Sequence, residues 1–145
     1  MKDLKEILVE SLNYNDDLNM WFRSLPISKI EYVSGMTKSY TLSINEYFAA
    51  RYIWWLSLSD DKKQKIYDKY KGASQTNSIT ITNDSTDEDV DLWFRSLPNN
   101  EIERIMKYDF SKSSKSTEES FLDAYRQWGR MGAQKCFTVA MKNQK

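Results

Sequence analysis

The sequence predicts an all-α protein made by tandem duplication, and three observations support that prediction. The hexapeptide WFRSLP at residues 21–26 returns letter for letter at residues 93–98, a shift of 72 positions. Apolar side chains recur at helical spacing around both copies. Serine or threonine followed three positions later by an acidic residue marks helix starts in both halves. We therefore expect two copies of a helix–corner–helix–loop–helix–helix unit, related by a pseudo-twofold axis and sharing one core.

The first copy follows a predicted amphipathic helix at residues 2–13. Its own first helix carries apolar residues at i, i+3, i+4 and i+7, namely Leu18, Trp21, Phe22 and Leu25. Pro26 makes a corner, because a proline pushes the preceding residue out of the α region and suits the first turn of a new helix. That new helix is expected to end at Gly35, since glycine readily takes the left-handed cap conformation.

A capping pattern at Ser43 and Glu46 begins an aromatic-rich helix. We expect its inward face to hold Tyr47, Ala50, Ile53, Trp54 and Leu58. A further helix is predicted for residues 62–70, ending at Gly72. Alternation of isoleucine and threonine at residues 79–82 also allows a short β-bridge as a minor element.

The second copy repeats this order. A helix up to Leu97 is followed by a corner at Pro98, and a capped helix begins near Ser116. Trp128 of that helix is aligned with Trp54 at a shift of 74. The predicted organisation is thus a leading helix and first repeat at residues 1–72, a polar linker at 73–86, and a second repeat with basic C-terminal helices at 87–145.

Composition excludes several classes of chemistry. The chain has 145 residues, no histidine and one cysteine, Cys136. Zinc sites of the usual kind, histidine-based acid–base catalysis and Cys-His or Ser-His-Asp triads are therefore excluded. We expect no catalytic residues, no cofactor and no metal, and we interpret Cys136 as a buried small residue. The Asp84–Asp91 run lacks the glycine and terminal glutamate of a calcium loop.

Charge is balanced overall but uneven along the chain. Lys+Arg and Asp+Glu are both 21, whereas residues 111–145 carry seven basic and three acidic side chains. The charged N-terminus does not match a signal peptide, and no apolar stretch approaches the length of a membrane span. With a single cysteine, these features predict a cytoplasmic protein that does not bind membranes.

Three side chains are the candidates for contacts with a protein partner. Trp21, Trp54 and Trp93 are expected in the core, whereas Trp55 is displaced by about 100° around its helix and is expected to face a partner or the other repeat. Arg23 and Arg95 occupy matching positions of the hexapeptides and project away from the apolar stripe. A salt bridge to Glu31 or Glu103 is their structural alternative.

These observations favour a non-enzymatic protein that binds, masks or scaffolds a larger protein partner, itself two-fold or repetitive. The Asn-, Lys-, Ile- and Tyr-rich composition resembles that of accessory or inhibitor proteins of phages and mobile elements. The alternative is a nucleic-acid-binding protein that uses the basic C-terminal helices. Its candidate contacts are Arg126, Arg130, Lys135 and Lys142.

Overall fold

The protein is all-α throughout the residues that the computed structural model describes, which are 17–71, 80–110 and 116–144. No strand occurs in these ranges, so the β-bridge expected as a minor element is not found there. The predicted helix at 2–13, and Ile79 of the expected bridge, lie outside them. None of the described helices is both long enough and apolar enough to cross a membrane.

Helices of the first half follow the predicted order. Residues 17–23 are helical, and after the corner at Pro26 comes α2 (Ile27–Ser34), which ends on Gly35 at a φ of 72°. The left-handed conformation there is one that glycine adopts without a steric penalty. The polar loop then leads to α3 (Ile44–Leu56) and α4 (Asp60–Tyr70).

Helices of the second half come in the same order, with a Leu-Pro corner after the first of them. They are α5 (Asp87–Arg95), α6 (Asn99–Met106), α7 (Thr117–Arg130) and α8 (Ala133–Asn143). Helix α5 ends at Arg95, two residues before the predicted end at Leu97. Pro98 turns the chain into α6, as Pro26 does into α2.

Side-chain caps hold the helix starts that the sequence predicts. The hydroxyl oxygens of Ser43 and Ser116 accept from the backbone N–H three residues on. Among the described helices, only the one that begins at Thr86 has the complete reciprocal box, because the Asp89 carboxylate also accepts from the Thr86 N–H. Such caps satisfy N–H groups that have no partner within the helix.

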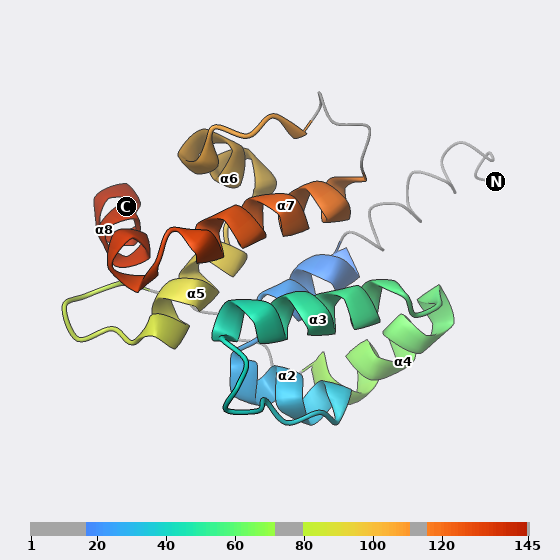
Figure 1. The fold of residues 1–145 in the computed structure, drawn as a ribbon. Coiled ribbons are helices and arrows are strands. Elements are labelled where there is room, and N and C mark those ends of the chain that lie inside the picture. Colours follow the sequence, from blue (N-terminus) through green and yellow to red (C-terminus); the bar gives the residue numbers. More distant parts are fainter. Residues whose placement is uncertain (1–16, 72–79, 111–115, 145) are drawn as a thin grey trace.

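Helices α3 and α7 lie side by side through the middle of the molecule (Figure 1). Helix α2 packs on α3, and α6 packs on α7. Helix α5 contacts both α3 and α8. Buried apolar residues from both halves form one continuous cluster, so the two halves share a core in the described structure.

The buried face of α3 differs from the expected one. Its fully or nearly fully covered residues are Tyr47, Phe48, Ala49, Tyr52 and Trp55. Of the expected inward residues, Ala50 and Ile53 are exposed, and Ile53 retains 47% of its surface. The prediction was wrong because the helix is apolar on almost every side, so periodicity allows more than one stripe. Packing against α7 selects the stripe that is buried.

The connection before α5 is attached to the C-terminal helix. Ile81 is buried, and its backbone N–H donates to the Gln144 side-chain oxygen at 2.7 Å. The Gln144 amide donates in turn to the Ile81 carbonyl at 2.6 Å. Part of the segment predicted to be a polar linker is therefore bound to the second half.

Gly129 allows α7 to approach α3. A double-mutant cycle with Asn45 can measure how much this close approach contributes to stability. A Cβ at Gly129 would lie 2.3 Å from Cγ of Asn45, whose amide donates to the Tyr125 carbonyl at 3.0 Å. Gly129→Ala should therefore lose about 1 kcal/mol with that hydrogen bond. In an Asn45→Ala background it should instead stabilise by about 0.5–1 kcal/mol through helix propensity. Urea denaturation of the four proteins measures the difference, and equal effects in both backgrounds would contradict the steric account.

Candidate functional site

The two arginines of the repeated hexapeptide meet at the centre of the molecule. Arg23 Nε donates to the carbonyl oxygen of Arg95 at 2.9 Å, and Arg23 Nη2 donates to that of Leu97. In return, Arg95 Nη1 donates to the carbonyl oxygens of Arg23 at 2.8 Å and Leu25 at 2.7 Å. Each arginine thus binds the same two carbonyl positions of the other hexapeptide.

These carbonyls are available because each helix ends at its Leu-Pro corner. The last carbonyls of a helix have no N–H ahead of them in the chain. At Pro26 and Pro98 the backbone turns to a ψ near 155°, so the next helix departs in another direction. A cation beside a helix C-terminus is also favoured by the helix dipole. Each guanidinium therefore caps the helix that carries the other.

An aromatic ring covers each guanidinium. The Arg23 Cζ lies 4.2 Å from the ring centre of Phe121, and the Arg95 Cζ lies 4.5 Å from that of Phe48. Arginine suits this environment because its planar, weakly hydrated cation stacks on rings while its N–H groups keep their acceptors. The exposed fractions are 2% for Arg23 and 0% for Arg95. Burial lowers the pKa of Arg23 to about 10, which leaves it protonated at neutral pH.

The two arginines differ in their third partner. Arg95 Nε donates to the Asp91 carboxylate at 2.7 Å, and the Tyr125 hydroxyl donates to the same group at 2.6 Å. Arg23 instead donates from Nη1 to the Asn99 side chain at 2.9 Å. Asn19 stands at the position corresponding to Asp91, so one half carries a buried carboxylate where the other carries a neutral amide. Neither arginine bonds to Glu31 or Glu103, the alternative considered from sequence.

Removal of Arg95 should lower the free energy of unfolding, mainly because it leaves the buried Asp91 carboxylate without its ion-pair partner. We expect Arg95→Met to destabilise the protein by about 3–5 kcal/mol, the usual result of leaving one charge of a buried pair uncompensated. Asp91→Asn restores a neutral group, and the double variant Arg95→Met/Asp91→Asn should recover part of that loss. Chemical denaturation of the wild type, both single variants and the double variant gives the coupling energy. Additive effects would show that the pair is not the source of the cost.

Trp55 lies in the core against Phe22 and Asn19 of its own half, whereas the sequence predicted that it faces a partner or the other repeat. Its exposed fraction is 0%, its ring stacks on Phe22 at 4.7 Å, and its indole N–H donates to Asn19 at 2.8 Å. In the second half Trp128 stacks on Phe94 at 4.4 Å. By contacts, Trp128 thus corresponds to Trp55 at a shift of 73, and the expected match with Trp54 is wrong. Helical phase alone could not distinguish two adjacent tryptophans.

The structure therefore brings Arg23 and Arg95 together and buries Trp55 near the C-terminal end of α3. None of these three side chains presents a surface to a partner. Sequence reasoning missed their mutual role, although one signal was present: an arginine repeated immediately before a helix-ending Leu-Pro pair. The sequence predicted either contacts with a partner or salt bridges to Glu31 and Glu103 for these arginines. In the structure, each arginine is instead both donor and acceptor for the other hexapeptide.

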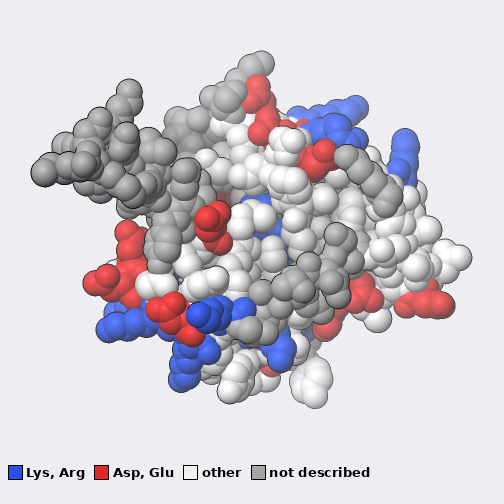
Figure 2. Space-filling view, turned by 180° about the vertical axis from the view of Figure 1, so that it is seen from behind, with Lys and Arg blue, Asp and Glu red and all other residues white. Residues whose placement is uncertain are grey.

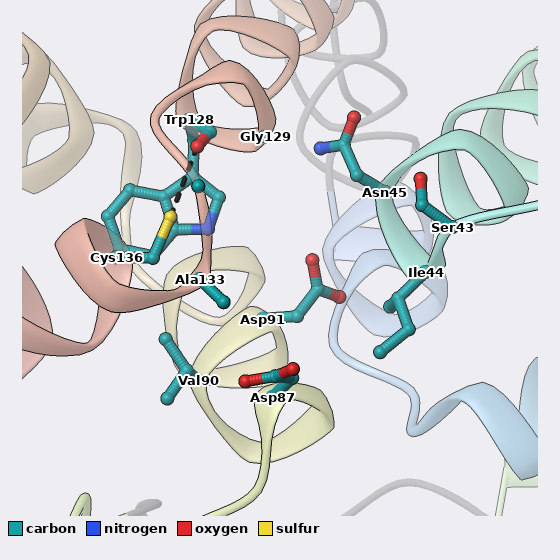
Figure 3. A pocket seen from close by; sticks show the side chains of 11 residues that line it. Ser43, Ile44, Asn45, Asp87, Val90, Asp91, Trp128, Gly129, Ala133 and Cys136 are labelled. Atoms are coloured by element: carbon teal, nitrogen blue, oxygen red, sulfur yellow. Dashed lines mark hydrogen bonds between the residues drawn. The ribbon is translucent and has the colours of Figure 1, made fainter.

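A small cavity of about 170 Å³ lies between α3, α5, α7 and α8 (Figure 3). Asp87 and Asp91 project into it from α5, facing Ser43 and Asn45 of α3. Both oxygens of Asp91 are already hydrogen-bonded within the protein. Among the described residues no group of three or more cysteine, aspartate and glutamate side chains could hold a metal ion.

Cys136 lines the same cavity and is buried, which confirms the interpretation of it as a small covered residue. Its thiol donates to the Trp128 carbonyl at 3.1 Å (Figure 3). Burial, with Asp91 and Asp87 nearby, raises the pKa of the thiol from 9.0 to about 11. The side chain is therefore neutral and unreactive at physiological pH.

Reaction with an aromatic disulfide reagent at pH 8 tests this assignment of Cys136. The raised pKa lowers the thiolate fraction about a hundredfold, and burial slows access further. We expect the native protein to react far more slowly than the same protein in denaturant. The rate should rise as the pH approaches 11. Equal native and denatured rates would contradict the buried, protonated thiol.

The four basic residues considered for nucleic acid are all exposed. Arg126 and Arg130 lie one turn apart near the end of α7, whereas Lys135 and Lys142 lie on α8. Arg126 and Arg130 also line a groove between α3 and α7, discussed below. On the face shown in Figure 2, basic and acidic side chains are intermixed and form no extended basic area among the coloured residues.

Large apolar side chains are exposed mainly in one part of the first half. Of the six that are exposed in the described structure, four lie between residues 32 and 42. They are Tyr32, Met36, Tyr40 and Leu42. We name residues 32–42 the apolar segment. Nothing in its sequence pattern had distinguished it from an ordinary polar loop, because its apolar residues are not periodic.

Comparison with known proteins adds no assignment, since no family model, curated protein or solved structure matches the chain.

Proposed function

We propose that this chain is a non-enzymatic helical interaction protein that binds, masks or scaffolds a larger protein partner. Exposure of the apolar segment is the observation that carries the proposal. Tyr40 is fully exposed, and Tyr32 and Met36 retain 68% and 50% of their surfaces. Tyrosine and methionine are enriched where proteins meet. Tyrosine supplies a large contact area at a low entropic cost, because it has only two side-chain torsions.

The apolar segment is held in a defined shape, which favours binding. The Tyr47 hydroxyl donates to the Met36 carbonyl, and the Leu42 N–H donates to the Ser39 carbonyl at 3.4 Å. The Tyr32 ring packs edge-on against Tyr70 at 5.2 Å. A surface ordered before binding loses less conformational entropy when a partner covers it.

The paired internal contacts support our further proposal that the halves are copies related by a pseudo-twofold axis. Phe48 stacks on Tyr52 at 5.4 Å, as Phe121 stacks on Tyr125 at 5.7 Å. Across the halves, Phe48 meets Tyr125 edge-on at 5.1 Å, and Phe121 meets Tyr52 edge-on at 5.5 Å. Together with the reciprocal arginines, these contacts favour a duplicated core.

The surfaces of the halves differ, which bears on the kind of partner. At a shift of 72, Arg104 stands where the first half has Tyr32, and its guanidinium pairs with Glu101 at 2.7 Å. Tyr108 stands at the position of Met36, and its hydroxyl donates to Asp123 at 3.2 Å. These differences favour one principal contact surface in the first half. A two-fold or repetitive target stays a prediction, as does an origin in a phage or mobile element.

Charge introduced into the apolar segment should abolish partner binding without unfolding the protein. We expect affinity capture from the native host lysate to recover a stoichiometric protein with the wild type. The Met36→Glu/Tyr40→Glu variant should lose it, because both side chains are exposed and would bury charges at the interface. Lys135→Glu/Lys142→Glu on α8 is the matched control and should retain it. Recovery of no stoichiometric protein, or equal recovery by both variants, would count against the proposal.

Exposure of Arg126, Arg130, Lys135 and Lys142 supports the second candidate function, nucleic-acid binding. Such binding should weaken by orders of magnitude between about 50 and 200 mM salt if several phosphates are neutralised. Replacing these residues with glutamine should reduce both the affinity and the salt slope. Absence of retention on DNA or RNA at about 50 mM salt would remove this candidate.

A further inference from the structure

A groove between α3 and α7 carries an inference separate from the apolar segment. It has a volume of about 510 Å³. Its α3 wall is formed by Ser43, Asn45, Glu46, Ala49, Ala50 and Ile53, and its α7 wall by Arg126, Gly129 and Arg130. The walls are held together, because the Asn45 amide bonds to the Tyr125 carbonyl where Gly129 lets the helices approach.

Small residues form part of both walls of the groove. Ala49, Ala50 and Gly129 contribute a methyl group or less, so another backbone could approach both helices closely. Ile53 adds an apolar side chain that retains 47% of its surface. Small residues between two helices, with a larger apolar residue beside them, suit the apolar face of an additional helix.

The two walls of the groove carry opposite charges, with two arginines on the α7 wall and one glutamate on the α3 wall. Arg126 and Arg130 are four residues apart and therefore lie on the same side of α7. Neither guanidinium has a hydrogen bond or ion pair within the described part of the chain. Glu46 stands on the α3 wall and is exposed. An occupant would thus meet two cations along one edge and one carboxylate along the other.

We propose that this groove binds an amphipathic helix of a protein partner whose acidic edge faces α7. Carboxylates one turn apart on that helix pair with Arg126 and Arg130, and its apolar stripe covers Ala50 and Ile53. A nucleic-acid strand fits less well, because the exposed Glu46 carboxylate on the α3 wall repels phosphates. The groove does not include the apolar segment, so the two surfaces can bind different parts of a partner.

The probe is a displayed library of short amphipathic helical peptides, selected against the full-length protein. We expect the recovered peptides to carry aspartate or glutamate in i, i+4 pairs beside an apolar stripe. Their affinity for Arg126→Glu/Arg130→Glu should fall by on the order of tenfold or more, since two exposed pairs become repulsive. Peptides in which those acidic residues are changed to lysine should bind Arg126→Glu/Arg130→Glu more tightly than they bind the wild type.

Two further variants make the test specific to the groove. Ala50→Trp fills part of the groove and should also weaken binding, whereas Lys135→Glu/Lys142→Glu makes the same charge change on α8 and should have no effect. All substituted positions are exposed, and circular dichroism melting checks that each variant is folded. Recovery of no binders, affinities insensitive to the charge reversal, or an equal loss with the α8 control would overturn the proposal.

Binding of duplex DNA that depends on Arg126 and Arg130 while no peptide binds would also overturn it. Failure of the apolar segment in the capture experiment leaves this test unaffected, because Met36→Glu/Tyr40→Glu changes no groove residue. That variant should bind the selected peptides as the wild type does. The two proposals therefore fail separately.

Discussion

Reciprocal binding of two buried arginines to helix-terminal carbonyls is the interaction on which the arrangement of this protein depends. Arg23 reaches the corner at Leu97, and Arg95 reaches the corner at Leu25. Burying a guanidinium is costly unless its donors are satisfied, and a helix end offers acceptors that nothing else in the helix uses. The requirement acts in both directions, because each hexapeptide offers two carbonyl acceptors to the arginine of the other. This gives a physical reason for the identity of the two hexapeptides. Of the guanidinium nitrogens of this pair, Arg95 Nη2 alone has no hydrogen-bond partner.

Aromatic side chains fill the space around this pair. Phe48 and Phe121 cover the two guanidinium groups and also contact each other edge-on at 6.3 Å. Stacked and edge-on rings supply much apolar area and tolerate a cation on their faces. Helices α3 and α7, which carry these rings, therefore pack together at the centre. Ala50 and Ile53 of α3 and Arg126 and Arg130 of α7 are exposed, and these residues line the groove between the two helices.

The internal pairing separates structural from functional residues. The most conspicuous sequence feature, the repeated hexapeptide, makes internal contacts. The side chains of Trp55, Arg23 and Arg95 are buried, so a partner cannot reach them. Exposed apolar residues of the apolar segment, such as Tyr32, stand where the second half has other residues, such as Arg104. Tyr32 contacts Tyr70 edge-on and still exposes 68% of its surface, and this exposure is the basis of the proposed partner contact.

By itself, the sequence determined the helical class, the corners at Pro26 and Pro98, and the helix starts at Ser43, Thr86 and Ser116. These follow from local chemistry: proline geometry, capping hydroxyl groups and the spacing of apolar residues. Only the tertiary structure decided which face of α3 is buried, where Trp55 lies and what Arg23 and Arg95 bind. Those outcomes depend on partners that are distant in the chain, 36 residues for the indole N–H of Trp55 and 72 for the reciprocal arginines. A helix that is apolar on most sides contains no local signal for which side its neighbour will cover.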